Sequence, residues 1–443
     1  MMRPAAGVGD RWRQVRRLLA TEGTAGLGRR VRLRLAEALV PPGSTGLAVS
    51  EEEVDRATAV AAGVVPAPGP LPWRPGEPMR VAWVCTPPAP GSGGHTTMFR
   101  LVSALEQAGH RCDLYLRDRH GWSLDQHREI IRTHWPEVRA GVHDLAGGIA
   151  DSHAVVATAW ESAYAVLASP ARGRRCYLVQ DLEPMFYPAG SAALLAEATY
   201  NFGMHGLTAG PWLAERLRAD HGMTADHFDF GCDLAVYRPR EDEPTVPRDG
   251  IAYYCRPGTP RRAHELALLA LTRFARLHPD VPIHCYGTVV ADLPFPAIQH
   301  GRLSPVELGA LYRRCVAGLV LSATNVSLVP LEMLAAGCVP VVNDAAQHRA
   351  VLDNPQVRYA TPTPRDLADA LADLVGQPPT ARRVRALAAA DSVEDVGWDR
   401  AGAQVEQALL RVVARPVAPD RSGVAPDIRD NSEGEVPCTS LTR

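Results

Sequence analysis

The chain has 443 residues, of which 46% are hydrophobic, and this is enough for two or three domains with large cores. Its formal net charge of -2 excludes the overall positive charge that is typical of nucleic-acid-binding proteins. We find no run of eighteen apolar residues and no signal-peptide pattern, so the sequence predicts a cytoplasmic protein without a membrane-spanning helix.

The sequence contains nine cysteines and no lysine, so all 47 basic residues are arginine. The cysteines are scattered and form no C-x-x-C pair, which predicts a reducing compartment and no structural zinc. No histidine pair has metal spacing and no D-x-D ends an apolar strand, so we expect no metal and no cofactor. Any cation that neutralises a phosphate is then an arginine, which can donate two parallel hydrogen bonds.

Residues 1–63 are predicted to form a basic helical extension, and a Pro-rich linker follows at 64–78. Residues 1–40 hold nine arginines and three acidic residues, with apolar side chains at i, i+3 and i+7. One interpretation of this pattern is peripheral contact between residues 1–40 and an anionic membrane, at its inner face. A solvated helix that packs on the body of the protein explains the pattern equally well.

The region 79–237 alternates apolar strands with amphipathic helices, which predicts a doubly wound, Rossmann-like sheet. Its predicted strands lie at 79–85, 111–116, 154–158, 175–180 and 205–210. Two helices stand out. One covers 95–110, and the other covers 211–222, with a proline at its start and a glycine at its end.

A polar linker at 238–250 precedes a second alternating region at 251–395. The predicted strands and helices of that region lie at 251–255, 261–278, 282–287, 304–315, 318–322, 327–337, 338–342 and 363–376. A C-terminal helical segment at 396–415 and a disordered tail at 416–443 complete the chain. The expected fold class is α/β, with two Rossmann-like domains that face each other across a cleft and an N-terminal helical extension.

Glu332 is the single charged residue between Gly318 and Val342. The surrounding pattern is strand, loop, helix and strand, with Ser327 as the predicted helix N-cap and Gly337 as the C′ glycine. The carboxylate borders the apolar face of a helix that follows the carboxyl end of a strand, where open α/β sheets bind ligands. The alternative is a partly solvated helix carboxylate that the helix dipole stabilises.

Three further turns follow predicted strands and carry polar groups. TPPAPGSGGHTTMFR (86–100) has glycines that let an anion approach the backbone before a helix N-terminus. CRPGTPRRAHE (255–265) brings together three arginines, which suit a diphosphate. QDLEPMFYP (180–188) places carboxylates beside aromatic rings, which suits a sugar. Each turn also has a plainer explanation, as a βα turn, a surface arginine cluster or an acidic loop.

Together these segments resemble the glycosyltransferases of GT-B architecture. The resemblance covers about residues 79–410. It rests on the two α/β regions, the GSGGH turn, RP-x-T-P-RR, YLVQD-x-EP and S-x-x-x-x-S-L-V-P-L-E-M-x-A-x-G-x-x-P-V-V. The retaining family 4, and within it the bacterial rhamnosyltransferase-like branch, is the most similar group. The chain departs from that family at Thr324, where another Glu usually stands eight residues before Glu332.

The resemblance implies a role for each matching residue. Arg256 and Arg261 would neutralise the diphosphate of a nucleotide sugar, and Glu332 would bind its ribose hydroxyls, so these three form the expected catalytic set. The other donor-binding residues that it implies are Gly93, Gly94, His95, Arg262, His300, Arg302, Asn325, Ser327 and Leu328. The residues that it implies on the acceptor side are Gln180, Asp181 and Glu183.

The expected function is the metal-independent, retaining transfer of a hexose, or of a deoxyhexose such as rhamnose, in polysaccharide or glycoconjugate biosynthesis. The expected partners are a nucleotide-diphosphate sugar as donor and a glycan or lipid-linked acceptor. One alternative is a sugar-nucleotide epimerase of the same architecture, which would need acid–base residues around the sugar. Another alternative is an inactive sugar-binding or scaffolding homologue. The presence of Thr324 in place of the usual Glu is consistent with this alternative.

Overall fold

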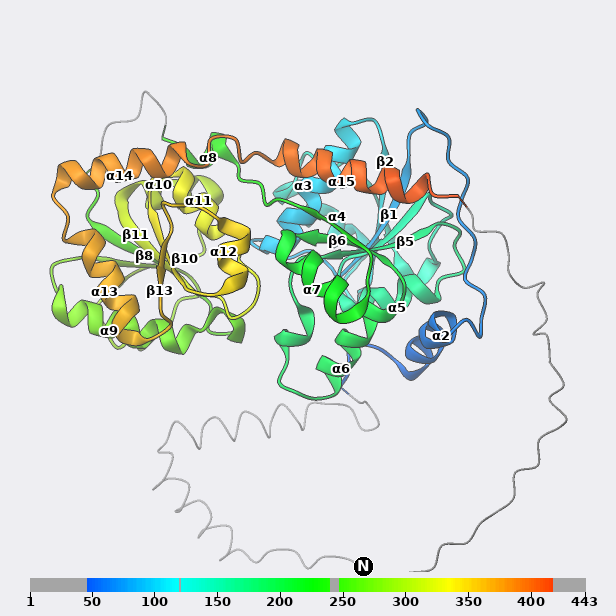
Figure 1. The fold of residues 1–443 in the computed structure, drawn as a ribbon, viewed down its shortest axis with the longest axis horizontal. Coiled ribbons are helices and arrows are strands. Elements are labelled where there is room, and N and C mark those ends of the chain that lie inside the picture. Colours follow the sequence, from blue (N-terminus) through cyan, green and yellow to red (C-terminus); the bar gives the residue numbers. More distant parts are fainter. Residues whose placement is uncertain (1–45, 119–120, 240–246, 417–443) are drawn as a thin grey trace, which may run out of the picture.

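The computed structural model describes residues 46–118, 121–239 and 247–416. Two parallel β-sheets, each surrounded by helices, organise these residues into a first lobe and a second lobe (Figure 1). In Figure 1 the first lobe lies on the right and the second lobe on the left. The predicted α/β class with two Rossmann-like units is confirmed.

The first lobe contains a seven-stranded parallel sheet in the order β3-β2-β1-β4-β5-β6-β7. Its strands are β1 (Arg80–Cys85), β2 (Arg111–Leu116), β3 (Gly141–Asp144), β4 (Ala154–Ala157), β5 (Arg174–Val179), β6 (His205–Ala209) and β7 (Ala225–Phe228). In the centre of the sheet, Val81 pairs with Cys112 on one side and Ala154 on the other. The central strands are almost wholly buried, because helices cover them and remove the need for polar alternation.

The helices of the first lobe connect these strands. They are α2 (Glu51–Ala61), α3 (Gly93–Gln107), α4 (Leu124–His134), α5 (Trp160–Ala168), α6 (Ser191–Ala198) and α7 (Pro211–His221), with a 3-10 turn η2 (Glu183–Phe186). The α3 helix begins two residues before the predicted one, because the Ser92 hydroxyl caps it by accepting from the His95 N–H. The α7 helix ends as predicted at Gly222, which has a left-handed backbone.

The second lobe contains a six-stranded parallel sheet in the order β10-β9-β8-β11-β12-β13. Its strands are β8 (Gly250–Cys255), β9 (Ile283–Gly287), β10 (Ile298–Gly301), β11 (Cys315–Val320), β12 (Val339–Asn343) and β13 (Arg358–Ala360). Its helices are α9 (His264–Leu277), α10 (Pro305–Arg314), α11 (Val329–Ala335), α12 (Ala346–Leu352), α13 (Pro364–Val375) and α14 (Pro379–Asp391), and a 3-10 turn η4 (Pro260–Arg262) precedes α9.

Helix ends in the second lobe test the predicted caps. The capping box of Ser304 and the Thr363 cap are confirmed. Gly337 has a φ of +72° after α11, as its C′ role requires. The prediction for Ser327 is wrong, because Leu328 is the N-cap of α11 and makes no side-chain cap.

The described part of the N-terminal extension differs from the predicted basic helix. Residues 1–45, and with them the predicted membrane contact of residues 1–40, lie outside the described residues. The α2 helix starts at a Ser50 capping box, has three glutamates in its first turn and packs on α5. Among the helices of the described ranges, none is both long and apolar enough to cross a membrane.

Two segments connect the lobes, and they pair with each other. The first contains the short helix α8 (Leu234–Tyr237), and the second leads into α15 (Trp398–Val413). The Cys232 N–H donates to the Val396 carbonyl at 2.9 Å, which holds the two crossing segments together. The α15 helix then packs on α3 and β7, so the chain returns to the first lobe and adds a helix that the predicted region 79–237 lacks.

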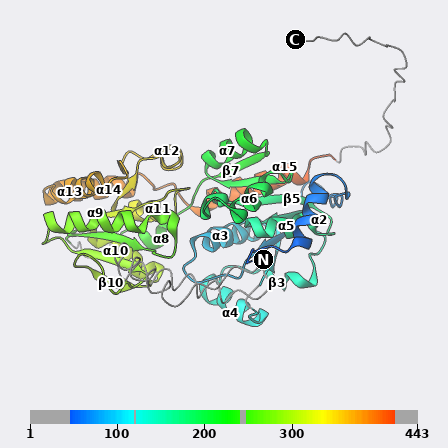
Figure 2. The same ribbon diagram turned by 90° about the horizontal axis from the view of Figure 1, so that it is seen from below.

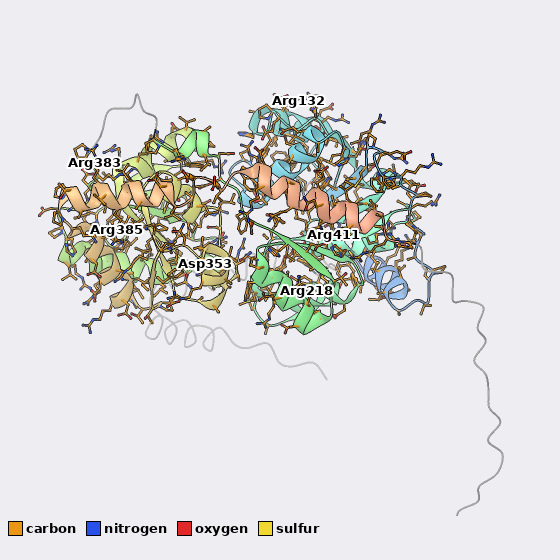
Figure 3. All side chains as sticks on the ribbon, turned by 45° about the horizontal axis from the view of Figure 1, so that its top comes forward. Arg132, Arg218, Asp353, Arg383, Arg385 and Arg411 are labelled. Carbon is orange, nitrogen blue, oxygen red and sulfur yellow. The ribbon has the colours of Figure 1, made fainter. Side chains whose placement is uncertain are left out.

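The figures show this return plainly. The α14 helix covers the second lobe and α15 covers the first, along the same edge of the molecule (Figure 1). Arg383 and Arg385 mark α14, and Arg411 marks α15, in the tilted view (Figure 3). Seen from below, α12 of the second lobe lies beside α7 of the first (Figure 2), and these helices are in contact.

Candidate functional site

The two lobes meet where strands of both sheets end, and Asp181 is the centre of that contact. This residue follows β5 of the first lobe, and only 8% of its surface is exposed. Its Oδ2 accepts a hydrogen bond of 2.8 Å from the Thr324 hydroxyl, and its Oδ1 accepts one of 2.9 Å from the Asn325 N–H. Both donors belong to the loop after β11 of the second lobe. A carboxylate of the first lobe is therefore held by hydrogen bonds from the second lobe.

The side chain of Asn325, from the second lobe, adds two hydrogen bonds to the contact between the lobes. Its side-chain amide donates to the carbonyls of Gln180 and Ala209, each at 3.0 Å. These carbonyls lie at the carboxyl ends of β5 and β6, so one amide joins two strands of the first lobe to the second. The side chain is fully buried, and its two hydrogen bonds satisfy both amide hydrogens.

The glycine turn before α3 reaches this region through Gln180. The Gln180 amide donates to the Gly94 carbonyl at 3.0 Å, and a side chain on Gly94 would stand 3.7 Å from that amide. Gly93 is exposed in the same turn. The His95 ring is held by Ser92 Oγ at 2.9 Å and the Thr86 carbonyl at 3.1 Å, and burial lowers its pKa.

Arg261 enters the contact from the second lobe. Its Nε lies 3.4 Å from Asp181 Oδ2, and its guanidinium carbon lies 4.1 Å from the centre of the Phe186 ring. Arg256 lies close enough to Arg261 to lower the pKa of that residue further, after the larger effect of burial. The predicted arginine pair is therefore brought together at the carboxyl end of β8.

Arg262 lies in the same turn and contacts the loop after β11. It donates to Ser322 Oγ at 2.9 Å, and that hydroxyl donates to the Asn325 carbonyl at 2.7 Å. Burial lowers the pKa of Arg262 to about 10. Through this contact Arg262 supports the loop after β11, and its binding to a donor stays a prediction.

Glu332 lies on α11 and is partly buried among tyrosines. Burial raises its pKa to about 7, the Tyr237 hydroxyl lowers it by donating a hydrogen bond, and Asp233 raises it. A row of aromatic rings leads away from this carboxylate. In this row Tyr286 shares a hydroxyl hydrogen bond of 2.6 Å with Tyr312, and its ring stacks on that of Tyr254 with 4.9 Å between the ring centres.

The far end of this tyrosine row is Arg256. Its guanidinium donates to the Tyr254 hydroxyl at 2.7 Å and lies 5.3 Å from the centre of that ring. Arg256 and Glu332 thus lie at opposite ends of one tyrosine row, which joins the ends of β8 and β9 to α11. This row was not predicted from the sequence, although paired tyrosines at the end of a predicted strand are a signal for it.

Glu183 does not lie where the acceptor prediction placed it. It is 5% exposed, its Oε2 accepts from the Trp160 N–H at 2.6 Å, and its Oε1 accepts from the Tyr177 hydroxyl at 3.0 Å. Burial raises the pKa of Glu183 to about 8. The carboxylate therefore caps α5 inside the first lobe, two residues from an aspartate that contacts the other lobe.

The remaining predicted residues lie around the second sheet. The His300 ring stacks on His284, with an Nε2–Nδ1 distance of 3.0 Å, beside Arg314 and not beside the Arg256–Arg261 pair. Arg302 is exposed after β10. The residues that lead into α11, both half-buried, are Ser327 and Leu328.

His348 on α12 was not predicted and is buried beside the contact between the lobes. Its Nδ1 donates to the Asn343 carbonyl at 2.7 Å. Burial lowers its pKa, and Arg262 and Asp181 act on the ring electrostatically. As for metals, the described ranges contain no group of three or more His, Cys, Asp or Glu residues that could hold an ion.

Comparison with known proteins finds a family model that matches part of the second lobe, and relatives that match more of the chain. The family model described as the C-terminal domain of WsaF matches residues 249–372. The O-antigen biosynthesis protein RfbC of Myxococcus xanthus is 36% identical over 280 residues, which are 59% of this chain and 21% of that protein. The chain thus spans about a fifth of the length of this relative.

Two solved structures share the two-lobed arrangement. One is Anabaena Alr3699/HepE in complex with UDP-glucose, with a TM-score of 0.58, 12% identity, and coverage of 75% of this chain and 100% of that one. The other is an S. aureus TarM mutant in complex with fondaparinux, alpha-GlcNAc-glycerol and UDP, with a TM-score of 0.61, 7% identity, and coverage of 76% and 100%. At these identities the likeness shows the fold alone, which is the GT-B architecture.

Proposed function

We propose that this chain is a glycosyltransferase that moves a hexose or deoxyhexose from a nucleotide-diphosphate sugar to a glycan or lipid-linked acceptor. The observation that carries the proposal is the ion pair between Arg261 of the second lobe and Asp181 of the first, where the two sheets end, with Arg256 close enough to act on Arg261 electrostatically. The GT-B architecture and the similarity to an O-antigen biosynthesis protein support this reaction class and a role in polysaccharide assembly.

In this proposal the second lobe binds the donor. Arg256 and Arg261 neutralise the diphosphate, and their positive charge stabilises the nucleotide diphosphate as the glycosidic bond to it breaks. Glu332 accepts hydrogen bonds from the ribose hydroxyls at the other end of the tyrosine row. Rhamnose as the sugar and retention of the anomeric configuration belong to the same proposal and rest on the resemblance described above.

The acceptor enters from the first lobe in this proposal. Gln180, which precedes Asp181 in the chain, and the Gly94 turn that it binds would form that wall. Glu183 is left out of this set, because it is an internal cap. Contact of residues 1–40 with an anionic membrane would bring the enzyme to a lipid-linked acceptor, and this contact stays a prediction.

The proposal is tested with purified protein in two steps. A panel of nucleotide sugars is first screened for thermal stabilisation, because a ligand at about 100 times its Kd adds roughly 2.7 kcal/mol to the free energy of unfolding. Release of the nucleotide diphosphate is then measured with and without candidate acceptors. We expect acceptor-dependent release. Conversion of the sugar without an acceptor would instead indicate an epimerase, and binding without release an inactive homologue.

A further inference from the structure

Two residues of the first lobe hold Arg261, although it belongs to the second. Asp181 lies 3.4 Å from its Nε, and the Phe186 ring lies under its guanidinium at 4.1 Å. Both come from the segment that follows β5, so the first lobe contacts both an edge and a face of this cation. The same guanidinium is one of the two that the proposed function assigns to the donor's diphosphate.

Asp181 has enough hydrogen bonds without Arg261. Its two oxygens accept from the Thr324 hydroxyl and from the N–H groups of Asn325 and Leu182, all at 2.8 or 2.9 Å. Arg261 Nε, in contrast, has no hydrogen-bond partner among the described residues, and its contact with the carboxylate is an ion pair alone. The aspartate is therefore fixed, whereas the arginine can change partner at a small cost.

The charges around Arg261 explain why a carboxylate is present there. Arg256 lies close by, and two neighbouring guanidinium groups repel each other. Burial lowers the pKa of Arg261, Asp181 raises it, and Arg256 lowers it again. A negative charge from the first lobe therefore stabilises the arginine pair, and a bound diphosphate would provide the same charge with stronger, two-pronged hydrogen bonds.

We propose that Asp181 is a positioning residue that pairs with Arg261 and releases it to the diphosphate of the donor, so that the first lobe competes with the donor for this cation. This inference rests on the proposed function, in which Arg261 binds the diphosphate. The resemblance to known glycosyltransferases implied a role for Asp181 on the acceptor side. In this proposal Asp181 instead controls the affinity for the donor. Donor binding would also loosen one of the contacts between the lobes.

The test titrates inorganic pyrophosphate into the full-length protein by calorimetry, because this probe needs no knowledge of the base or sugar. We expect D181N to bind pyrophosphate about fivefold more tightly than the wild type, because the competing charge is gone. Asparagine can still accept from the two N–H groups that hold Asp181. R261Q is expected to bind about tenfold more weakly.

The matched control is T324V, which removes a hydrogen bond to the same carboxylate but keeps its charge. Its pyrophosphate affinity should stay within about twofold of the wild type. Thermal unfolding verifies that each variant is folded, and D181S, which also removes the charge, replaces D181N if that variant does not fold.

The outcomes separate the inference from the proposed function. Unchanged or weaker binding by D181N, together with weakened binding by R261Q, would overturn the inference and leave the proposed function standing. Unchanged binding by R261Q, or no binding by the wild type, would contradict the diphosphate role of Arg261 and remove both. Tighter binding by T324V equal to that of D181N would show that a loosened contact, and not the lost charge, is responsible.

Discussion

Two glutamates, one buried and one partly buried, show how differently similar carboxylates act in this molecule. Glu183 caps α5 and bonds to Tyr177, and burial raises its pKa to about 8. Glu332 bonds to Tyr237 beside the tyrosine row, and burial raises its pKa to about 7. The first has its partners within the protein, whereas the second is partly exposed and can accept further hydrogen bonds from a ligand. Glu183 therefore has a structural role, and Glu332 keeps the capacity to bind a ligand that the proposed function assigns to it.

Replacing Glu183 with Ala should destabilise the first lobe and leave donor binding unchanged. The change leaves the Trp160 N–H and the Tyr177 hydroxyl without partners, at a cost of roughly 2–4 kcal/mol. Denaturant unfolding measures this cost, and E197A, at an exposed position on α6, is the control. Loss of acceptor-dependent turnover in a folded Glu183→Ala protein would instead support the acceptor-side prediction.

Glu332 should make stability and donor affinity respond to pH in opposite directions. A carboxyl whose pKa is raised from 4.5 to about 7 favours its neutral form, so the free energy of unfolding falls as pH rises through this range. The ribose hydroxyls donate to the ionised form, so donor affinity should rise between pH 6 and about pH 8. In E332Q both trends should be weaker, as calorimetry and thermal unfolding across pH would show. A donor affinity that is insensitive to E332Q would exclude Glu332 from the site.

At the scale of single residues, the sequence predicted which turns carry the candidate site residues. It did not predict which residues of the other lobe these side chains contact. Arg256 and Arg261 are close enough to act on each other electrostatically, because they share one turn after a strand. The partner of Arg261 lies 80 positions earlier, and no local pattern connects the two. The difference between Asp181 and Glu183 depends on the η2 turn, which directs one carboxylate to the other lobe and the next inward.

At the scale of elements, long strands and capped helices were predictable, and short ones were not. The strands β3, β7, β10 and β13 have four residues or fewer, and too few apolar side chains to reveal a strand period. All four are edge strands of their sheets, where less burial is required. The fold class did not depend on them, because the central strands already alternate with helices.

The contact between β11 and α11 depends on a glycine. A side chain at Gly318 would come within 2.5 Å of the sulfur and terminal methyl of Met333, which is fully buried. Gly318→Ala should therefore displace α11, reduce stability by about 1–3 kcal/mol and weaken donor binding through Glu332. Adding Met333→Ala should recover part of the loss, and strict additivity of the two changes would contradict this account.

At the scale of the whole molecule, the paired crossing segments control how the lobes are oriented. Gly231 lies against Trp398, so the first crossing can approach the second only without a side chain at this position. Arg100 of α3 also binds Asp233 at 2.7 Å, just before α8, and Tyr237 at the end of α8 bonds to Glu332. The connection between the lobes is thus in contact with the proposed donor site.

Gly231→Ala should change the arrangement of the lobes more than their internal stability. The new methyl would stand 2.5 Å from the Trp398 ring and 2.8 Å from its Cα, so the two crossings must separate. We expect an altered small-angle scattering profile and a kcat reduced by about tenfold or more, because small misplacements of reacting groups are costly. Gly397→Ala, in the second crossing with open space around it, is the control. Unchanged scattering and turnover in Gly231→Ala would refute this role.

The return of α15 also affects how the protein is made. The strands of the first sheet leave the ribosome early, but the surface of α3 near Ala104 is covered only when Gly402 arrives. The second sheet and its helices, by contrast, come from one continuous stretch of residues 250–391. Although domains usually mature in order of synthesis, we expect the later lobe to finish folding first here, while the earlier one waits for its last helix.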